Sequence, residues 1–132
     1  MGEKHIQYAH VLNNIGLIYA DMGKYEQAMQ NYEQSLSIKG EIKGKESEEY
    51  ADTLHNIGIV LDEKGEYESA LQKFEQSLQI IQKIYGNQHI RCANRLNNIG
   101  AVYVHMGKYA TAIEYYQRCL TIEEIELGTE HP

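Results

Sequence analysis

The feature that most constrains this chain is an internal repeat. When the 132-residue sequence is shifted by 42 positions, residues of one kind coincide throughout in a single register. The sets that define this register are Leu12, Leu54 and Leu96; Ile15, Ile57 and Ile99; Gly16, Gly58 and Gly100; Gly23, Gly65 and Gly107; Tyr25, Tyr67 and Tyr109; and Ala28, Ala70 and Ala112. Chance does not give so many matches in one register, so the chain consists of three copies of one unit.

Each unit has the periodicity of two helices. Ile15 follows Leu12 by three residues and Val11 by four, which is the spacing of apolar residues on one face of an amphipathic helix. The same spacing resumes after Tyr25. Gly23 separates the two halves, and we expect it to end the first helix in a left-handed conformation. The pattern predicts an all-α chain with six antiparallel helices at about 6–22, 25–43, 48–64, 67–85, 90–106 and 109–127.

The recurring stretch LNNIG, at Leu12–Gly16, is unfavourable inside a helix. Asparagine costs roughly half a kcal/mol and glycine about 1 kcal/mol relative to alanine. We expect the glycine to be kept because a side chain there would hold the two helices of a unit apart. The expected contacts join Gly16, Gly58 and Gly100 to Ala28, Ala70 and Ala112.

The order of these residues resembles the tetratricopeptide repeat. The matching positions in the first unit are Leu12, Ile15, Gly16, Tyr19, Gly23, Lys24, Tyr25, Ala28, Tyr32 and Ser35. The usual unit of that family has 34 residues. The longer unit seen here, with TLHNIG, GKYEQA and YEQSLSI, is similar to the repeats of kinesin light chains. The resemblance implies an α-solenoid with a right-handed superhelix, whose first helices line a concave groove that binds peptides or partner helices.

Within this resemblance the chain is expected to be a single array. We place its repeats at approximately 5–46, 47–88 and 89–130, with His131 and Pro132 opening a truncated fourth repeat. We therefore interpret the chain as a fragment of a longer array. Its last helix would then expose apolar residues such as Ile113 and Leu120. The alternative to a binding function is therefore a structural module whose copies associate end to end through their uncapped terminal helices.

The groove face of the array is the side of each first helix opposite its core residues. The residues expected on it are His10, Asn13, Asn14, Leu17 and Asp21; Asp52, His55, Asn56, Ile59 and Glu63; and Asn94, Asn97, Asn98, Ala101 and His105. Asn14, Asn56 and Asn98 would form a ladder across the groove, and a carboxamide can pair with both backbone groups of an extended peptide. The alternative is that these amides tie each helix to the backbone of the neighbouring repeat, and the sequence leaves both interpretations open.

The charges on this face indicate what kind of ligand it prefers. The resemblance suggests two known ligand types, acidic chaperone tails and acidic cargo motifs, and both require basic residues in the groove. Here the groove carries Asp21, Asp52 and Glu63, with Arg91 and Arg95 expected only near its edge. A neutral or basic segment of a protein or peptide is the expected ligand.

Several other function classes find no support in the sequence. The net charge of -7 argues against a nucleic-acid surface, and no apolar run is long enough for a membrane span. No nucleophile–base pair, phosphate loop, HxxxH pair or CxxC motif occurs, so we expect no enzyme activity, cofactor or metal site. Cys92 and Cys119 are interpreted as packing positions in a reduced, cytoplasmic protein.

Overall fold

The computed structural model describes residues 2–128, and the side chains of residues 5–128. Its elements are α1 (Gly2–Asp21), α2 (Tyr25–Lys43), α3 (Glu48–Glu63), α4 (Tyr67–Tyr85), the short 3-10 helix η1 (Ile90–Cys92), α5 (Ala93–His105) and α6 (Tyr109–Leu127). The predicted all-α fold is confirmed, and most predicted ends agree within two residues. The exceptions are α1, which begins four residues early, and residues 90–92, which form η1 instead of the first turn of α5.

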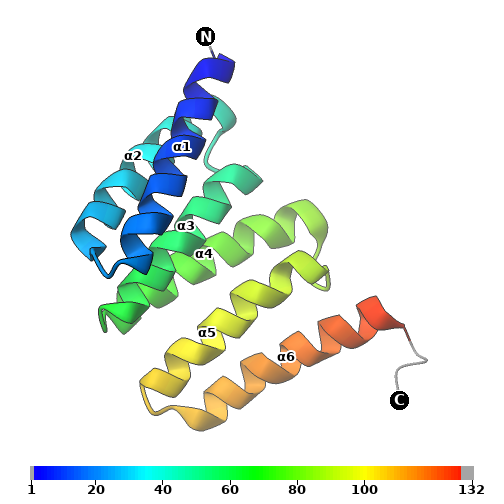
Figure 1. The fold of residues 1–132 in the computed structure, drawn as a ribbon. Coiled ribbons are helices and arrows are strands. Elements are labelled where there is room, and N and C mark those ends of the chain that lie inside the picture. The colour runs from blue at the N-terminus through cyan, green and yellow to red at the C-terminus, as the bar shows by residue number, and fades with distance from the viewer. Residues whose placement is uncertain (1, 129–132) are drawn as a thin grey trace.

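The helices are arranged as three pairs that stack into an α-solenoid (Figure 1). Within a pair, α1 packs on α2, α3 on α4 and α5 on α6. Between pairs, the second helix of one pair contacts the first helix of the next, so that α2 packs on α3 and α4 on α5. We refer to these two contacts, with the neighbouring α1–α3 and α3–α5 contacts, as the first and second junctions.

The turn within each pair has the same backbone structure. Gly23 has φ +76°, which confirms the predicted left-handed residue. The amide of Lys24 donates to the carbonyl of Tyr19 at 2.8 Å, and the amide of Gly23 donates to that of Ala20 at 2.9 Å. These are the two bonds of a Schellman cap, and they recur after α3 and α5.

The close approach of the two helices of a pair depends on the glycine of LNNIG. A Cβ atom at Gly16, Gly58 or Gly100 would lie 2.6, 2.7 or 2.9 Å from an aromatic ring of the partner helix. The rings belong to Tyr32, Phe74 and Tyr116. The expected close approach is therefore confirmed, and the atoms nearest to the glycine belong to the ring four residues beyond the expected alanine.

A second contact recurs in every pair. The hydroxyl of Ser35 donates to the carbonyl of Ala9 at 2.7 Å, and the hydroxyl of Ser77 repeats the bond to Ala51 at 2.7 Å. In the third pair the thiol of Cys119 takes this place and donates to Ala93 at 3.2 Å. Cys119 and Cys92 are both buried free thiols, which agrees with their interpretation as packing residues.

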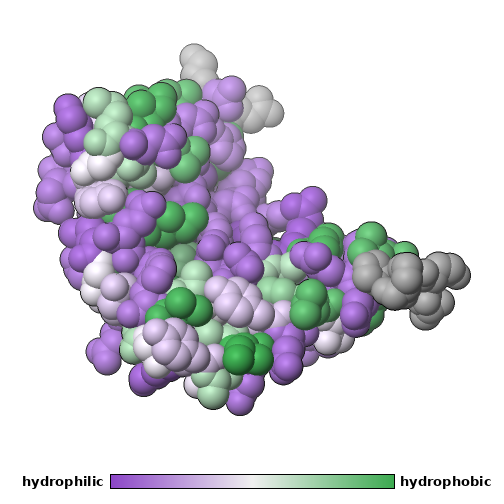
Figure 2. All heavy atoms as spheres, turned by 60° about the horizontal axis from the view of Figure 1, so that its bottom comes forward, coloured by the Kyte–Doolittle hydropathy of each residue, from purple (hydrophilic) through white to green (hydrophobic). Residues whose placement is uncertain are grey.

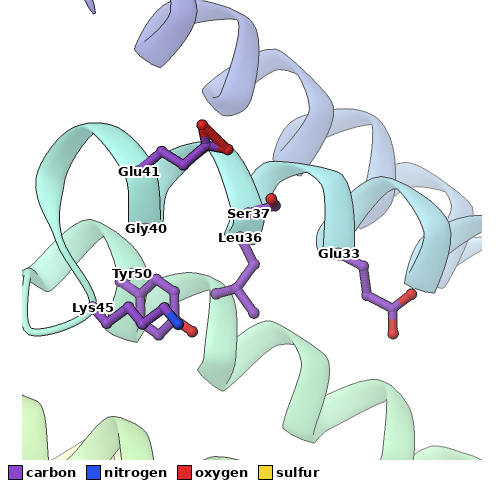
Figure 3. A pocket seen from close by; sticks show the side chains of 7 residues that line it. All are labelled: Glu33, Leu36, Ser37, Gly40, Glu41, Lys45 and Tyr50. Carbon is purple, nitrogen blue, oxygen red and sulfur yellow. The ribbon is translucent and has the colours of Figure 1, made fainter.

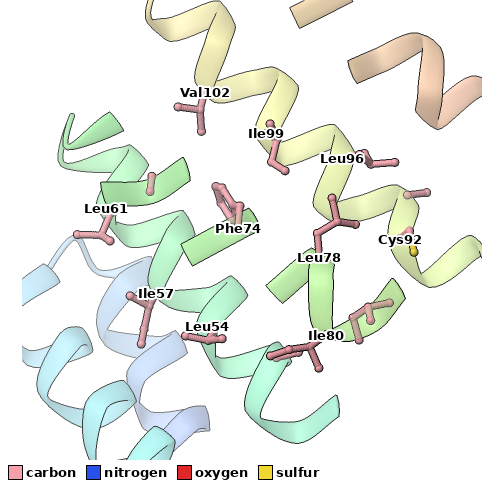
Figure 4. Close-up of a cluster of buried hydrophobic side chains, with 14 of the residues drawn as sticks. Leu54, Ile57, Leu61, Phe74, Leu78, Ile80, Cys92, Leu96, Ile99 and Val102 are labelled. Atoms are coloured by element: carbon pink, nitrogen blue, oxygen red, sulfur yellow. The ribbon is translucent and has the colours of Figure 1, made fainter. Parts of the chain in front are cut away.

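The core is most complete around the middle pair, which neighbours cover on both sides (Figure 4). Leu54, Ile57 and Phe74 of this pair are fully buried, and Ile99 and Val102 of α5 close the same cluster. In the first pair, Ile15 is the equivalent of Ile57, and its side chain is 38% exposed. Burial therefore depends on the position of a unit in the array as well as on its sequence.

The ring-on-glycine contact predicts the effect of one methyl group. Gly58→Ala would place a Cβ atom 2.7 Å from the Phe74 ring, and we expect this overpacking to lower the free energy of unfolding by about 1–2 kcal/mol despite the better helix propensity of alanine. Urea unfolding measures the change. In a Phe74→Leu background the same substitution should cost clearly less; an equal cost in both backgrounds would contradict the assigned contact.

Candidate functional site

The first helices of the pairs place most of the predicted groove residues at the surface. Six side chains in this set are half-buried, namely His10, Asn13, Asn56, Ile59, Asn98 and Ala101. Eight are exposed, namely Asn14, Leu17, Asp21, Asp52, Glu63, Asn94, Asn97 and His105. His55 alone is buried. Figure 2 shows one hollowed side of the molecule, between its N-terminal part and the arm that ends at the C-terminus, where hydrophilic residues fill most of the hollow.

Polar side chains connect the first helices of neighbouring pairs in a regular way. Five contacts join residues that lie 43 positions apart, which is one repeat plus one residue. The pairs are Asn13 with Asn56, Glu48 with Arg91, Asp52 with Arg95, His55 with Asn98, and Asp62 with His105. The first pair belongs to the first junction and the other four to the second. The second junction therefore contains more of these regularly spaced contacts than the first.

Two of the three ladder asparagines contact the neighbouring repeat, which was one of the two interpretations left open by the sequence. The amide of Asn56 donates to the Oδ1 atom of Asn13 at 3.1 Å, and the amide of Asn98 lies 2.9 Å from the Nε2 atom of His55. These two amides thus bond to the preceding repeat, through a side chain and not through the backbone. Asn14 is exposed and makes no hydrogen bond to another residue of the described range.

His55 was expected on the open face, and this expectation is wrong. Its side chain is only 9% exposed, and its ring packs on Phe74 with 5.2 Å between the centroids. With Nε2 accepting from Asn98, the Nδ1 atom is buried without a partner among the described residues. Burial, and then the charge of Arg95, lower the pKa of His55 from 6.5 to about 4, so the ring is neutral at pH 7.

Two cations are buried at the junctions, and sequence reasoning missed both. Lys39 is 2% exposed, and its ammonium donates to the hydroxyl of Thr53 at 2.7 Å. Burial lowers the pKa of Lys39. In the second junction Ile81 replaces the lysine and Arg95 replaces the threonine, so the cation has moved from the second helix to the first. The sequence does contain a signal for these two cations, because a charged residue at a core position of the helical pattern indicates a buried ion.

Arg95 was expected at the groove edge but lies inside the second junction. It is 5% exposed, its Nη2 atom donates to Asp52 at 2.5 Å, and its Nε atom donates to Ser77 at 3.1 Å. α4 covers the guanidinium, which explains the error. Consequently, Asp52 is an exposed carboxylate whose charge is already balanced.

The free negative charge of the face lies at the ends of α1 and α3. Asp21 and Glu63 are exposed residues at equivalent positions of the last turns, where the helix dipole is also negative. Burial raises the pKa of Glu63, and the nearby charges of Asp62 and Asp21 raise it further. The pKa of Tyr32 is raised to about 12, mainly by burial and further by the negative charges of Asp21 and Glu63. The carboxylates of Asp21, Asp62 and Glu63 therefore repel one another. Of the three, only Asp62 has a partner in the described part of the chain, namely the Nδ1 atom of His105 at 2.9 Å.

One cavity among the described residues lies away from this acidic end. A cavity of about 370 Å³ lies between α2 and α3, where Gly40 leaves room beside the ring of Tyr50 (Figure 3). Its other lining residues are Glu33, Leu36, Ser37, Glu41 and Lys45. Within residues 2–128, no three acidic, histidine or cysteine side chains are grouped closely enough to hold a metal ion. No helix of the described range is long and apolar enough to cross a membrane.

The sequence profile of the tetratricopeptide repeat matches residues 7–80 and residues 49–125. The chain belongs to the tetratricopeptide repeat family. The two matches begin 42 residues apart, which is the length of the repeat found in the sequence. Proteins of this fold generally mediate protein–protein interactions as scaffolds. A search of curated proteins found no match to this tetratricopeptide repeat chain.

Several solved structures share the fold. BtubC (BKLC) from P. vanneervenii has 25% sequence identity and a TM-score of 0.84, with 94% of this chain and 49% of that chain covered. A putative kinesin light chain with nearly identical TPR-like repeats, from Podosopora anserina, has 19% identity and a TM-score of 0.80 over 96% of this chain and 60% of that one. The TPR domain of Arabidopsis FLU has 17% identity and a TM-score of 0.76 over 97% and 100%. This chain thus spans about half to three fifths of the first two proteins.

The asparagine contacts predict different effects for two adjacent residues. Asn98→Ala would leave His55 without its partner in the second junction, and we expect a loss of about 1–2 kcal/mol in the free energy of unfolding. Asn97→Ala, at an exposed position, is the matched control and should change stability by less than about 0.5 kcal/mol. Equal effects in chemical denaturation would contradict the assignment.

Burial of His55 predicts a pH dependence of stability. Because its pKa is lowered from 6.5 to about 4 in the fold, the unfolded chain takes up the proton first as the pH falls. The contribution of His55 to the free energy of unfolding is complete above about pH 6.5. It decreases by up to about 3 kcal/mol as the pH approaches 4.

The matched variant is His55→Asn, which would copy the Asn13–Asn56 pair of the first junction. Urea unfolding at pH 7 and pH 4.5 should show a smaller acid-induced loss in this variant than in the original chain. Identical losses would show that His55 is not the group responsible.

Proposed function

We propose that this chain is a non-catalytic interaction module that binds an extended peptide segment carrying basic residues along the face formed by α1, α3 and α5. The observation that carries the proposal is the unbalanced negative charge of Asp21 and Glu63 beside Asp62. A lysine or arginine of a ligand placed there would reduce the repulsion among these carboxylates.

Three cations at the junctions support the same preference. Arg95 and Lys39 are buried, and Arg91 donates to Glu48 at 2.6 Å, so none of the three is free to bind an acidic ligand. Leu17, which is 41% exposed, together with the half-buried Ile59 and Ala101, would contact the apolar part of a peptide. Asn14 and Asn97 are the amides that remain available for the ligand backbone.

A peptide-binding experiment tests this function. We expect a random peptide library passed over the immobilised chain to be enriched in Lys and Arg and depleted in Asp and Glu. For a selected peptide, the double variant Asp21→Asn, Glu63→Gln should weaken binding about tenfold, measured by fluorescence anisotropy at low salt.

The matched control removes two charges elsewhere. Glu114→Gln together with Glu124→Gln changes two exposed carboxylates of α6 and leaves α1 and α3 intact. This variant should bind the peptide with nearly the original affinity. A library without basic enrichment, or equal loss in both double variants, would overturn the proposed site.

A further inference from the structure

The two ends of the array expose residues that the internal junctions bury. On the first helices, the positions that face the preceding pair are occupied by Tyr50, Thr53, Ile57 and Val60 in α3, and by Cys92, Arg95, Ile99 and Val102 at the start of the third pair. All eight are buried. Their counterparts on α1, the N-terminal face, are Tyr8, Val11, Ile15 and Ile18. Ile18 is 60% exposed, whereas Val60 and Val102 are completely buried.

The opposite end shows the same relation. On the second helices, the positions that face the following pair are Tyr25, Met29 and Leu36 in α2, and Tyr67, Leu71 and Leu78 in α4, all of which pack against the core. Their counterparts on α6, the C-terminal face, are Tyr109, Ile113 and Leu120. Leu120 is 59% exposed, whereas Leu78 is 7% exposed, and hydrophobic side chains gather along the arm that leads to the C-terminus in Figure 2.

We propose that the C-terminal face of one copy of this chain packs on the N-terminal face of a second copy, head to tail. Applying the relation between neighbouring pairs once more, from the third pair of one copy to the first pair of the next, brings the two faces together. The contact would thus continue the two existing junctions, with apolar residues at the corresponding positions on both sides. Because the two surfaces differ, the association is open and can add further copies.

The polar register supports this arrangement independently of the apolar residues. The spacing of 43 positions places Asn97 of one copy opposite Asn14 of the next, and these are the equivalents of Asn13 and Asn56, which are bonded at 3.1 Å. Both Asn97 and Asn14 are exposed. A hollow of about 500 Å³ opens beside Asn97, and its other lining residues are Ile90, Arg91, Ala93, Asn94, Arg95, Cys119 and Glu123.

The new junction would be weaker than the internal two. The register places Glu123 opposite Val11, where the first junction has Lys39 bonded to Thr53 and the second has Ile81 and Arg95 at the equivalent positions. The net charge of -7 on every copy also opposes association. We therefore expect reversible association that strengthens as salt is added, because salt screens the repulsion.

Sedimentation velocity on the chain, from about 10 µM to about 1 mM, tests the proposal. The mean mass should rise with concentration beyond that of a dimer. Ile18→Glu blocks the N-terminal face and Leu120→Glu blocks the C-terminal face, and both residues are exposed, so circular dichroism should show an unchanged fold. Ile84→Glu is the matched control, since Ile84 belongs to neither face and glutamate occupies the equivalent position 126.

Mixing the two blocked variants gives the decisive result. Each should be monomeric alone, while the mixture should form dimers and nothing larger, because only one pair of intact faces remains. A chain that stays monomeric at all these concentrations overturns the proposal, as does a blocked variant that still dimerises alone, which would indicate a symmetric contact. Association lost equally in Ile84→Glu would also overturn it.

Discussion

The contact on which the rest of the structure depends is the aromatic ring that lies against the glycine of LNNIG. Because Gly16, Gly58 and Gly100 have no side chain, the rings of Tyr32, Phe74 and Tyr116 reach the backbone of the first helix. The two helices of each pair are thereby held in nearly the same relation. Pairs of similar structure can stack by one repeated operation, which produces both the junctions and a continuous face of first helices.

The two junctions solve the same packing problem with different polar groups. The first buries Lys39 against Thr53, and the second buries Arg95, which is paired with Asp52. In both, one asparagine of the later repeat bonds to a side chain of the earlier repeat. Lys39 and Arg95 are both buried inside the array, whereas Asp21 and Glu63 are exposed carboxylates of the open face.

Much of the fold could be predicted from the sequence, because the 42-residue period and the helical spacing are local patterns. The site was less predictable. His55 occupies a polar position of the pattern, yet the neighbouring pair covers it, and burial between repeats depends on contacts that no single unit contains. The period alone also could not show whether Asn56 and Asn98 bond to a ligand or to a repeat. Comparing positions 39, 81, 53 and 95 as a set would have indicated the buried cations.

The central claim is that the face of α1, α3 and α5 binds a basic peptide segment. Chemical-shift mapping of the labelled chain with a lysine-rich peptide tests it most directly. The account predicts that the largest shifts fall on Asn14, Leu17, Asp21, Ile59 and Glu63. Shifts concentrated on α2, α4 or α6, for instance around the cavity beside Gly40 and Tyr50, would contradict it.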